Sequence, residues 1–408
     1  MGLSTAIFLA ILSPLTLRAE DWPGFRGPNA DGVSKDERIP TEWSATKNLK
    51  WKLKLPGKGF SSPIVVGKHV IVTAWSGSGR DVKRHIVCVD RTSGDVLWQD
   101  EVEGQSDGGD SGFSYHGQAS HTPVSDGERV YVLFGSSGVF AYDLSGKRLW
   151  HREVGNERRA RFGTSSSPIL HGDQLIVTAG CESASIRAFN KQTGEELWKA
   201  EADSLAQTYS TPRIVKGPDG REDLLLSVVF ELWGMNPENG KLRWYAETKV
   251  DTAACPSILV EGGVAYVIGG RGGGRTAVKI GGKGDTSKDA VVWSESGGSY
   301  VPSPVLHNGH LYWINDSGIA SVVDIKTGEQ VTRKRLGGRF YSSVTLVNDK
   351  LYAVSRFDGT YVLKATPELE QIALNKLGDD SDFSGSPAIS DGQLFIRSDE
   401  ALYCIAAE

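Results

Sequence analysis

The chain has 408 residues, a formal net charge of −5, 49 glycines, 11 tryptophans and 2 methionines. The negative charge excludes a bulk electrostatic attraction to nucleic acid or to an anionic membrane, so no nucleic-acid partner is expected. Abundant glycine and tryptophan, without long helical periodicity, favour an all-β chain.

The first segment is an apolar leader. Ile7 to Leu17 is largely apolar, and the small Ala19 precedes two acidic residues. The stretch is too short to span a bilayer, and no other apolar run is long enough, so no transmembrane span is expected. We predict a signal peptide over 1–19 and a periplasmic or secreted protein, the alternative being an uncleaved leader or a short anchor. No cysteine lies near the predicted cleavage point, so a lipid anchor is not expected.

Residues 20–47 are rich in glycine, proline and asparagine and show no strand alternation. We predict that they form an irregular arm, which Trp22 and Phe25 anchor. Beyond the arm, a small residue, a glycine six positions later and a tryptophan ten positions later form a recurring unit. The full copies span 88–98, 188–198 and 234–244, a shorter copy spans 141–150, and 322–332 has Thr332 in place of the tryptophan.

A second signal marks the start of each unit. Two residues, mostly small, precede a proline and an apolar strand at seven starts, whose prolines are at 63, 123, 168, 212, 256, 304 and 387. An eighth start, Ser342-Ser343-Val344, has the same shape without proline. A period of roughly 40–50 residues with four short strands predicts a β-propeller. Small residues and proline suit an innermost edge strand near the axis, and tryptophan on the outer strand suits a wedge between neighbouring blades.

The two ends of the repeat region complement each other. The last unit has three strands, whereas Leu49–Leu55 alternates apolar and polar residues and has no unit of its own. We predict that this N-terminal strand completes the last blade, which removes an open sheet edge. We therefore predict that residues 48–408 form one all-β, eight-bladed propeller and that the protein is a monomer.

The four cysteines are Cys88, Cys181, Cys255 and Cys404, and none are adjacent. Free cysteine behaves as a small buried hydrophobe, which favours core thiols. A disulfide is the alternative in an oxidising compartment.

The tryptophan spacing, the Ser-Ser-Pro strand starts and the eight units resemble the tryptophan-docking propellers of the pyrroloquinoline quinone (PQQ) repeat superfamily. The segment Trp22–Pro28 is similar to the opening of exported bacterial members. The resemblance implies either of two functions. Quinoprotein dehydrogenases bind PQQ and calcium at the channel mouth and carry adjacent cysteines, which this chain lacks. The BamB propeller of the outer-membrane assembly machinery is a non-catalytic scaffold of similar size. We expect a non-catalytic binding scaffold, with a PQQ-dependent alcohol or sugar oxidoreductase of divergent site as the alternative; PQQ and calcium are its candidate cofactors.

Long loops are expected on the face that holds the channel mouth, at 76–84, 103–120 and 269–275, and rigid scaffolds often carry function on such loops. A protein partner or small ligand is expected there. The glycine run in 269–275 does not complete GxGxxG and predicts a hairpin loop. The candidate interaction residues are Arg80, Arg84, Tyr115, His116, Arg271 and Arg275.

The residues just ahead of each innermost strand should surround the mouth: Phe60, His116, Arg161, Tyr209, Tyr300, Arg339, Tyr341 and Asp382. Arg161 and Arg339, with Tyr300 and Tyr341, would hold a planar anionic ligand by bidentate contacts and stacking. The alternative is that these side chains only solvate a polar channel. The histidine pairs His307/His310 and His116/His121 have no further Cys or His at zinc-ligand spacing, and Asp379–Asp382 lacks a calcium-loop pattern. No nucleophile–base signature is visible either, so no metal or catalytic residue is expected.

Overall fold

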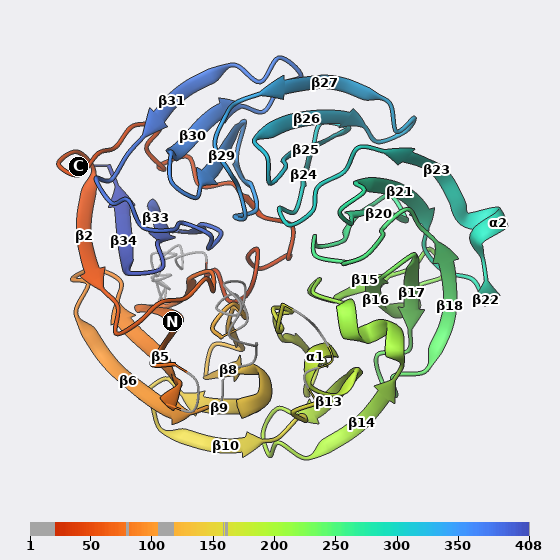
Figure 1. Ribbon diagram of the computed structural model, residues 1–408, viewed down its shortest axis with the longest axis horizontal. Helices are drawn as coiled ribbons and strands as arrows, with labels where there is room; N and C mark the ends of the chain where they lie inside the picture. Colours follow the sequence, from red (N-terminus) through yellow and green to blue (C-terminus); the bar gives the residue numbers. More distant parts are fainter. Residues whose placement is uncertain (1–20, 79–80, 105–117, 158, 160–161, 408) are drawn as a thin grey trace, which may run out of the picture.

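The computed structural model describes residues 21–78, 81–104, 118–157, 159 and 162–407. These residues form a ring of eight antiparallel blades around a central axis (Figure 1). Each blade has four strands that follow one another outward from the channel, and two blades carry a further short strand. The predicted all-β, eight-bladed propeller is confirmed.

Blades 1 to 4 follow the predicted strand starts. Their strands, from the channel outward, are β3 (Ile64–Val66), β4 (His69–Ser76), β5 (Lys83–Asp90) and β6 (Val96–Glu103); β7 (Val124–Ser125), β8 (Arg129–Leu133), β9 (Val139–Asp143) and β10 (Arg148–Arg152); β11 (Ile169–His171), β12 (Gln174–Ala179), β13 (Ser185–Asn190) and β14 (Glu196–Glu201); and β15 (Arg213–Lys216), β16 (Glu222–Val228), β17 (Glu231–Met235) and β18 (Leu242–Glu247).

Blades 5 to 8 continue the same order. Their strands are β19 (Leu259–Glu261), β20 (Val264–Gly269), β21 (Gly274–Lys279) and β23 (Val291–Ser296); β24 (Val305–His307), β25 (His310–Ile314), β26 (Ile319–Asp324) and β27 (Gln330–Arg335); β28 (Thr345–Val347), β29 (Lys350–Ser355), β30 (Gly359–Lys364) and β31 (Gln371–Asn375); and β32 (Ala388–Ser390), β33 (Gln393–Arg397), β34 (Ala401–Ala406) and β2 (Leu49–Lys54).

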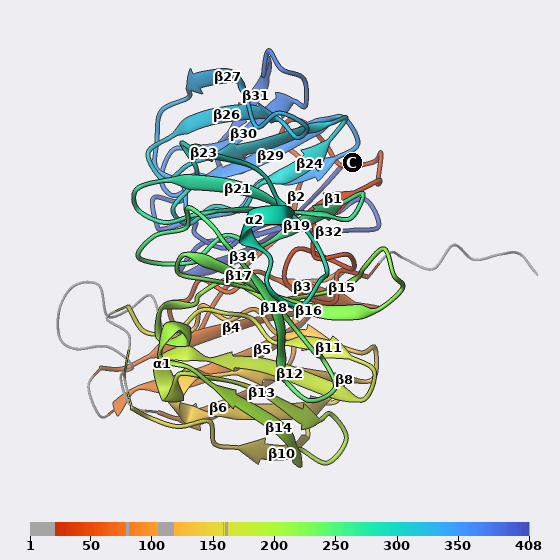
Figure 2. The same ribbon diagram turned by 90° about the vertical axis from the view of Figure 1, so that its right-hand side faces the viewer.

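The remaining elements are short. β1 (Val33–Ser34) lies parallel to β28, and β22 (Gly284–Asp285) lies parallel to β18. The helical turns are η2 (Gly135–Ser137), α1 (Gly180–Ser183), η3 (Asp203–Gln207) and α2 (Ser287–Ala290). Figure 2 shows α1 and β1 on opposite sides of the ring. No helix in the described part of the chain is long and apolar enough to cross a bilayer.

The ring closes as predicted. β2 pairs antiparallel with β34, and Trp51 lies opposite Cys404. The N-terminal strand therefore supplies the outermost strand of blade 8 and covers the edge that β34 would otherwise expose.

Tryptophan docking explains the spacing of the repeated unit. The indole Nε1 of Trp51 donates to the Arg91 carbonyl oxygen of blade 1 at 3.0 Å. Its ring covers Gly94, whose φ is +80° and where a Cβ would lie 2.8 Å from the ring. The glycine is required because the tryptophan of the preceding blade occupies the place of a side chain. The same contact joins Trp98 to Gly146, Trp150 to Gly194, Trp198 to Gly240 and Trp293 to Gly328.

Two of the three blades without such a pair have other contacts. Trp244 of blade 4 is fully buried, and its indole Nε1 donates to Asp223 at 2.8 Å. Blade 7 has Ala373 opposite Val362, the position that tryptophan takes in other blades. There Trp43 of the arm stacks on Tyr352, with ring centroids 6.1 Å apart.

The arm, residues 21–47, crosses the face that carries the turns between the first two strands of each blade. Trp22 exchanges two backbone hydrogen bonds of 2.9 Å with Val65 of blade 1. Arg26 donates to the Pro304 carbonyl oxygen of blade 6, and Leu346 of blade 7 donates to the Gly32 carbonyl oxygen at 2.8 Å. The arm therefore spans the channel axis, and it contains one short strand, β1, where the sequence predicted none.

Candidate ligand-binding site

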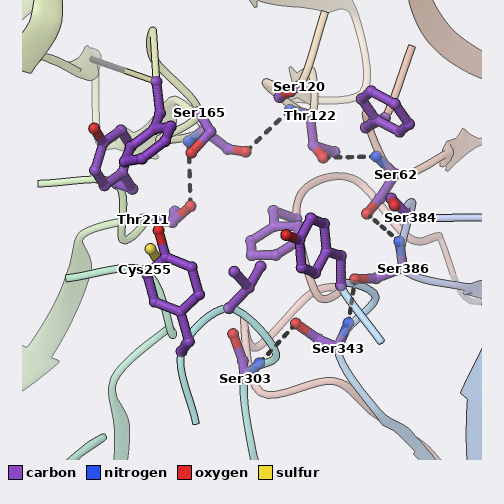
Figure 3. Close-up of a pocket in the computed structure, with 18 of the residues that line it drawn as sticks. Ser62, Ser120, Thr122, Ser165, Thr211, Cys255, Ser303, Ser343, Ser384 and Ser386 are labelled. Carbon is purple, nitrogen blue, oxygen red and sulfur yellow. Dashed lines mark hydrogen bonds between the residues drawn. The ribbon is translucent and has the colours of Figure 1, made fainter. Parts of the chain in front are cut away.

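The central channel holds a cavity of about 210 Å³, which we call the channel cavity (Figure 3). Phe25 of the arm lines it, as do residues from all eight blades, so the arm blocks one end of the channel. Its lining is aromatic or hydroxylated apart from Val301, Cys255 and Arg271, and comprises Phe25, Phe60, Ser62, Ser120, Thr122, Phe162, Ser165, Ser167, Tyr209, Thr211, Cys255, Arg271, Tyr300, Val301, Ser303, Tyr341, Ser343, Ser384 and Ser386.

A ring of hydroxyl groups joins the blades around this cavity. The backbone N–H of Ser62 donates to Thr122 Oγ1 of the next blade at 2.9 Å, and Thr122 N–H donates to Ser167 Oγ at 3.0 Å. The other links are Ser167 to Thr211, Ser303 to Ser343, Ser343 to Ser386 and Ser386 to Ser62. We call Ser62, Thr122, Ser167, Thr211, Ser303, Ser343 and Ser386 the hydroxyl ring. Each oxygen satisfies a buried backbone donor that would otherwise be costly.

Blade 5 interrupts the hydroxyl ring. Its equivalent position is Cys255, a weak hydrogen-bond acceptor, and Ser257 N–H makes the bond to Ser303 Oγ instead, at 2.9 Å. Burial raises the pKa of the Cys255 thiol to about 12, against the opposing effect of Arg271. Cys255 is thus a neutral, partly exposed thiol in the cavity wall, and all four cysteines are free. Cys88, Cys181 and Cys404 are buried, as expected of core thiols.

Arg271 stands at the rim of the channel cavity between two aromatic rings. Its guanidinium carbon lies 5.2 Å from the Phe162 centroid and 5.1 Å from the Tyr300 centroid. Its Nη2 donates to the Tyr300 hydroxyl at 3.4 Å, and this contact raises the pKa of Arg271. Burial raises the pKa of Tyr300, so a cation and a neutral phenol face the cavity at neutral pH.

The glycine run 269–275 holds Arg271 in place. It forms the turn between β20 and β21, which confirms the predicted hairpin loop. The Asp251 carboxylate accepts the Gly272 N–H at 3.0 and 3.1 Å, and Thr252 Oγ1 accepts the Arg271 N–H at 3.3 Å. A Cβ on Gly270 would overlap the Asp251 side chain. Glycine thus lets the carboxylate approach the loop backbone and fix the arginine.

The residues predicted at the mouth divide into two groups. Phe60, Tyr209, Tyr300 and Tyr341 line the channel cavity, as does Arg271, which the sequence assigned to an interaction loop. Arg339 is exposed and is not among the lining residues, and its backbone carbonyl accepts the Arg356 N–H at 2.8 Å. Asp382 is buried in an ion pair with Arg356, whose guanidinium lies 4.4 Å from the Tyr341 centroid.

Two predicted interaction residues have internal partners. Arg84 is 0% exposed and donates to the backbone and side-chain oxygens of Gln118, both at 3.0 Å. Arg275 is 4% exposed and donates to the carbonyl oxygens of Gly297 and Gly328. Both brace loops, so we do not include them in the proposed site. Arg80, Tyr115, His116 and Arg161 lie outside the described residues.

The sequence analysis named Phe25 only as an anchor of the arm and not as a cavity residue, and it missed Phe162 and the hydroxyl ring. The hydroxyl ring had a visible signal, because seven of the eight strand starts carry serine or threonine at their second position. The arm residue Phe25 had none, since its place in the channel depends on the path of the arm across the ring.

The family model described as "Outer membrane protein assembly factor BamB" matches residues 35–182 and 80–216. A quinoprotein ethanol dehydrogenase of Pseudomonas aeruginosa is 33% identical over 143 residues, which are 31% of this chain and 22% of the relative. Quinoprotein alcohol dehydrogenase PedH of Pseudomonas putida is 31% identical over 166 residues, 38% of this chain and 25% of the relative. Over residues 35–216 the chain is therefore similar to the PQQ-like β-propeller family.

Two solved structures share the fold. BamB from Moraxella catarrhalis superposes with a TM-score of 0.63 at 12% identity, covering 88% of this chain and 99% of that one. A europium-containing methanol dehydrogenase has a TM-score of 0.69 at 11% identity, covering 95% and 98%. At such identities the likeness extends to the fold alone. The chain matches only about a fifth to a quarter of the length of the curated dehydrogenases.

The lining does not fit PQQ with calcium, the cofactors that the dehydrogenase branch implies. PQQ is a tricyclic anion with three carboxylates, whereas one described lining residue is a cation and none is an Asp or Glu that could ligate calcium. The cavity of about 210 Å³ is also smaller than the roughly 300–1,000 Å³ of sites for drug-sized ligands. In the described ranges, no three His, Cys, Asp or Glu side chains group as a metal site.

Proposed function

We propose that the protein is a non-catalytic binding scaffold that receives a ligand or a partner's side chain at the end of the channel opposite the arm. We call this end the open end, because Arg271 is exposed there among the described residues. The observation that carries the proposal is the composition of the channel cavity, which is aromatic and hydroxylated with one guanidinium at its rim. Such a lining provides contact area and hydrogen bonds, the two properties that a binding pocket needs.

The same groups are poorly suited to redox chemistry on an alcohol. Oxidation of an alcohol requires a base near the reacting hydroxyl, and a base must lie within hydrogen-bond reach of the proton it takes. The hydroxyl-ring oxygens accept backbone N–H groups, and burial keeps the Cys255 thiol protonated. Tyr300 and Tyr209 are held in the neutral form, because burial raises the pKa of each phenol.

We also propose that the protein is exported and monomeric, with its partner on the face that carries Arg271. The apolar leader supports export, although residues 1–19 lie outside the described residues. The match to the BamB model supports a role in protein interaction. The competing function is a PQQ-dependent dehydrogenase, favoured by the local identity to quinoprotein ethanol dehydrogenases.

Reconstitution with PQQ and calcium tests the proposal. The purified protein is mixed with both, desalted, and examined for quinone absorbance and for ethanol-dependent reduction of an artificial electron acceptor. A quinoprotein ethanol dehydrogenase treated in parallel is the positive control. We expect no retained quinone and no reduction. A stoichiometric quinone spectrum together with acceptor reduction would establish the dehydrogenase instead.

A further inference from the structure

We propose that the channel cavity binds a single aromatic ring that carries a carboxylate, with the ring inside the cavity and the carboxylate on Arg271. This inference rests on the proposed function and names the ligand class of the same site. It follows from the size of the cavity, the nature of its wall and the position of its one described cation.

Size limits the ligand to about one ring. The channel cavity measures about 210 Å³. An engineered apolar cavity of ~150 Å³ is large enough to bind benzene. The channel cavity therefore accommodates one substituted ring and a few further atoms. Phe25 of the arm closes the end of the cavity that is farther from Arg271.

The wall favours an aromatic occupant. Phe60, Phe162, Tyr209, Tyr300 and Tyr341 come from five different blade connections and surround the cavity. Aromatic pairs gain from edge-to-face and offset-stacked contacts beyond the area they bury. Below them, each hydroxyl of the hydroxyl ring keeps a hydrogen that it can donate to the face or to a polar substituent of a bound ring.

Charge selects an anionic substituent. Arg271 is exposed and forms no ion pair with an acidic side chain among the described residues, in contrast to Arg356, which pairs with Asp382. The nearby Asp251 carboxylate accepts the Gly272 N–H and serves the loop. Phe162 and Tyr300 contact the guanidinium and hold it at the rim. A planar guanidinium presents paired N–H donors that match a carboxylate.

Two sources present this chemistry: a free aromatic acid, and the C-terminal aromatic residue of a polypeptide. Both carry one ring and one carboxylate within a few bonds. They differ in what lies beyond the carboxylate-bearing carbon, where a polypeptide continues out of the cavity toward the loop face.

Calorimetric titration separates these possibilities. The probes are N-acetyl-phenylalanine, its neutral amide, N-acetyl-glycine, and the peptide Gly-Gly-Gly-Phe with a free or amidated C-terminus. The variants are Arg271→Gln and, as a matched control, Arg333→Gln on the exposed outer strand β27. We expect N-acetyl-phenylalanine to bind at least about tenfold more tightly than its amide and than N-acetyl-glycine, since of these three probes only the first has both a ring and a charge. Arg271→Gln should abolish the preference over the amide, and Arg333→Gln should preserve it.

The outcomes are distinct. Tighter binding of the peptide than of the acetylated amino acid identifies a polypeptide terminus as the source, and equal or weaker binding identifies a free acid. Equal affinity for acid and amide, a preference that survives in Arg271→Gln, or no binding of any probe would overturn the inference and leave the scaffold function standing. Retained PQQ with acceptor reduction would instead overturn the proposed function itself. Unchanged melting temperatures of both variants show that they are folded.

Discussion

The two ends of the channel use similar residues for different purposes. At the blocked end, Arg26 lies with Trp22 and Phe25 in the arm, is 2% exposed, and donates to the carbonyl oxygens of Asp31 and Pro304. At the open end, Arg271 lies between Phe162 and Tyr300 and is exposed. Burial lowers the pKa of Arg26 to about 9, whereas the contact with Tyr300 raises that of Arg271. Residue type alone therefore does not distinguish a structural arginine from one that faces a ligand. The distinction is whether protein carbonyl oxygens already accept the guanidinium N–H groups.

The largest expected effect on stability comes from deleting both the arm, which blocks one end of the channel, and strand β2, which closes the ring. Deletion of residues 20–55 removes the arm and β2, which exposes the edge of β34. We expect aggregation or unfolding, because an unpaired edge strand is a template for association. Light scattering and circular dichroism measure this outcome.

A matched deletion of residues 20–47 keeps β2. We expect it to lose stability, because Trp22, Ile39 and Trp43 are buried, yet to remain a soluble monomer. The closure model fails if the longer deletion stays monomeric with an unchanged melting temperature.

A pair of point variants compares the two ends directly. Trp22→Ala should cost about 3–5 kcal/mol of unfolding free energy, as other large buried truncations do. Tyr300→Ala at the partly exposed rim should cost less than about 1 kcal/mol. Denaturant titrations of both variants measure the difference, and equal losses would show that the open end is as structural as the blocked one.

The wall between the two ends depends on the hydroxyl ring. Ser343→Ala removes the acceptor for the buried Ser303 N–H, and we expect a loss of about 1–3 kcal/mol. Ser165→Ala, at a partly exposed lining position outside the ring of bonds, should change stability by less than about 0.5 kcal/mol. If urea denaturation shows no difference between these two variants, the inter-blade hydroxyl bonds do not stabilise the wall.

A smaller, pH-dependent effect is expected at His121, beside Thr122. Burial, with a contribution from Arg84, lowers its pKa to about 3, against about 6.5 in an unfolded chain. The unfolded state therefore binds a proton more readily, so stability is complete above about pH 6.5 and declines as pH falls toward 3.

We expect His121 to account for a loss of about 1 kcal/mol between pH 6.5 and 5.5. His121→Gln should reduce the decline by that amount, measured as unfolding free energy at both pH values. An identical pH dependence in the variant would show that His121 titrates normally in the folded protein.

The fold could be predicted because its signals are local and repeated. The contact between Trp51 and Gly94 recurs at four further pairs, so each copy reinforces the interpretation of the others. The ring closure followed from strand alternation in 49–55.

The candidate site was only partly predictable, because it depends on contacts between distant segments. Tyr300 and Tyr341 followed from their positions ahead of an innermost strand. The sequence does not distinguish the roles of Arg271, Arg275 and Arg339. Only the folded chain shows that Arg271 lines the channel cavity, whereas Arg275 donates to internal carbonyl oxygens. Phe25 enters the cavity because the arm crosses the ring, which no local pattern indicates.

The accessibility of Cys255 tests the central claim that the open end of the channel receives the ligand. Cys255 lines the channel cavity, whereas Cys88, Cys181 and Cys404 are buried. The measurement is the rate at which each cysteine of the native protein is alkylated by N-ethylmaleimide, followed by mass spectrometry with and without N-acetyl-phenylalanine. We predict that Cys255 reacts first and that N-acetyl-phenylalanine slows its reaction more than its amide does. Alkylation of a buried cysteine at the same rate, or a Cys255 rate unaffected by saturating N-acetyl-phenylalanine, would contradict the account.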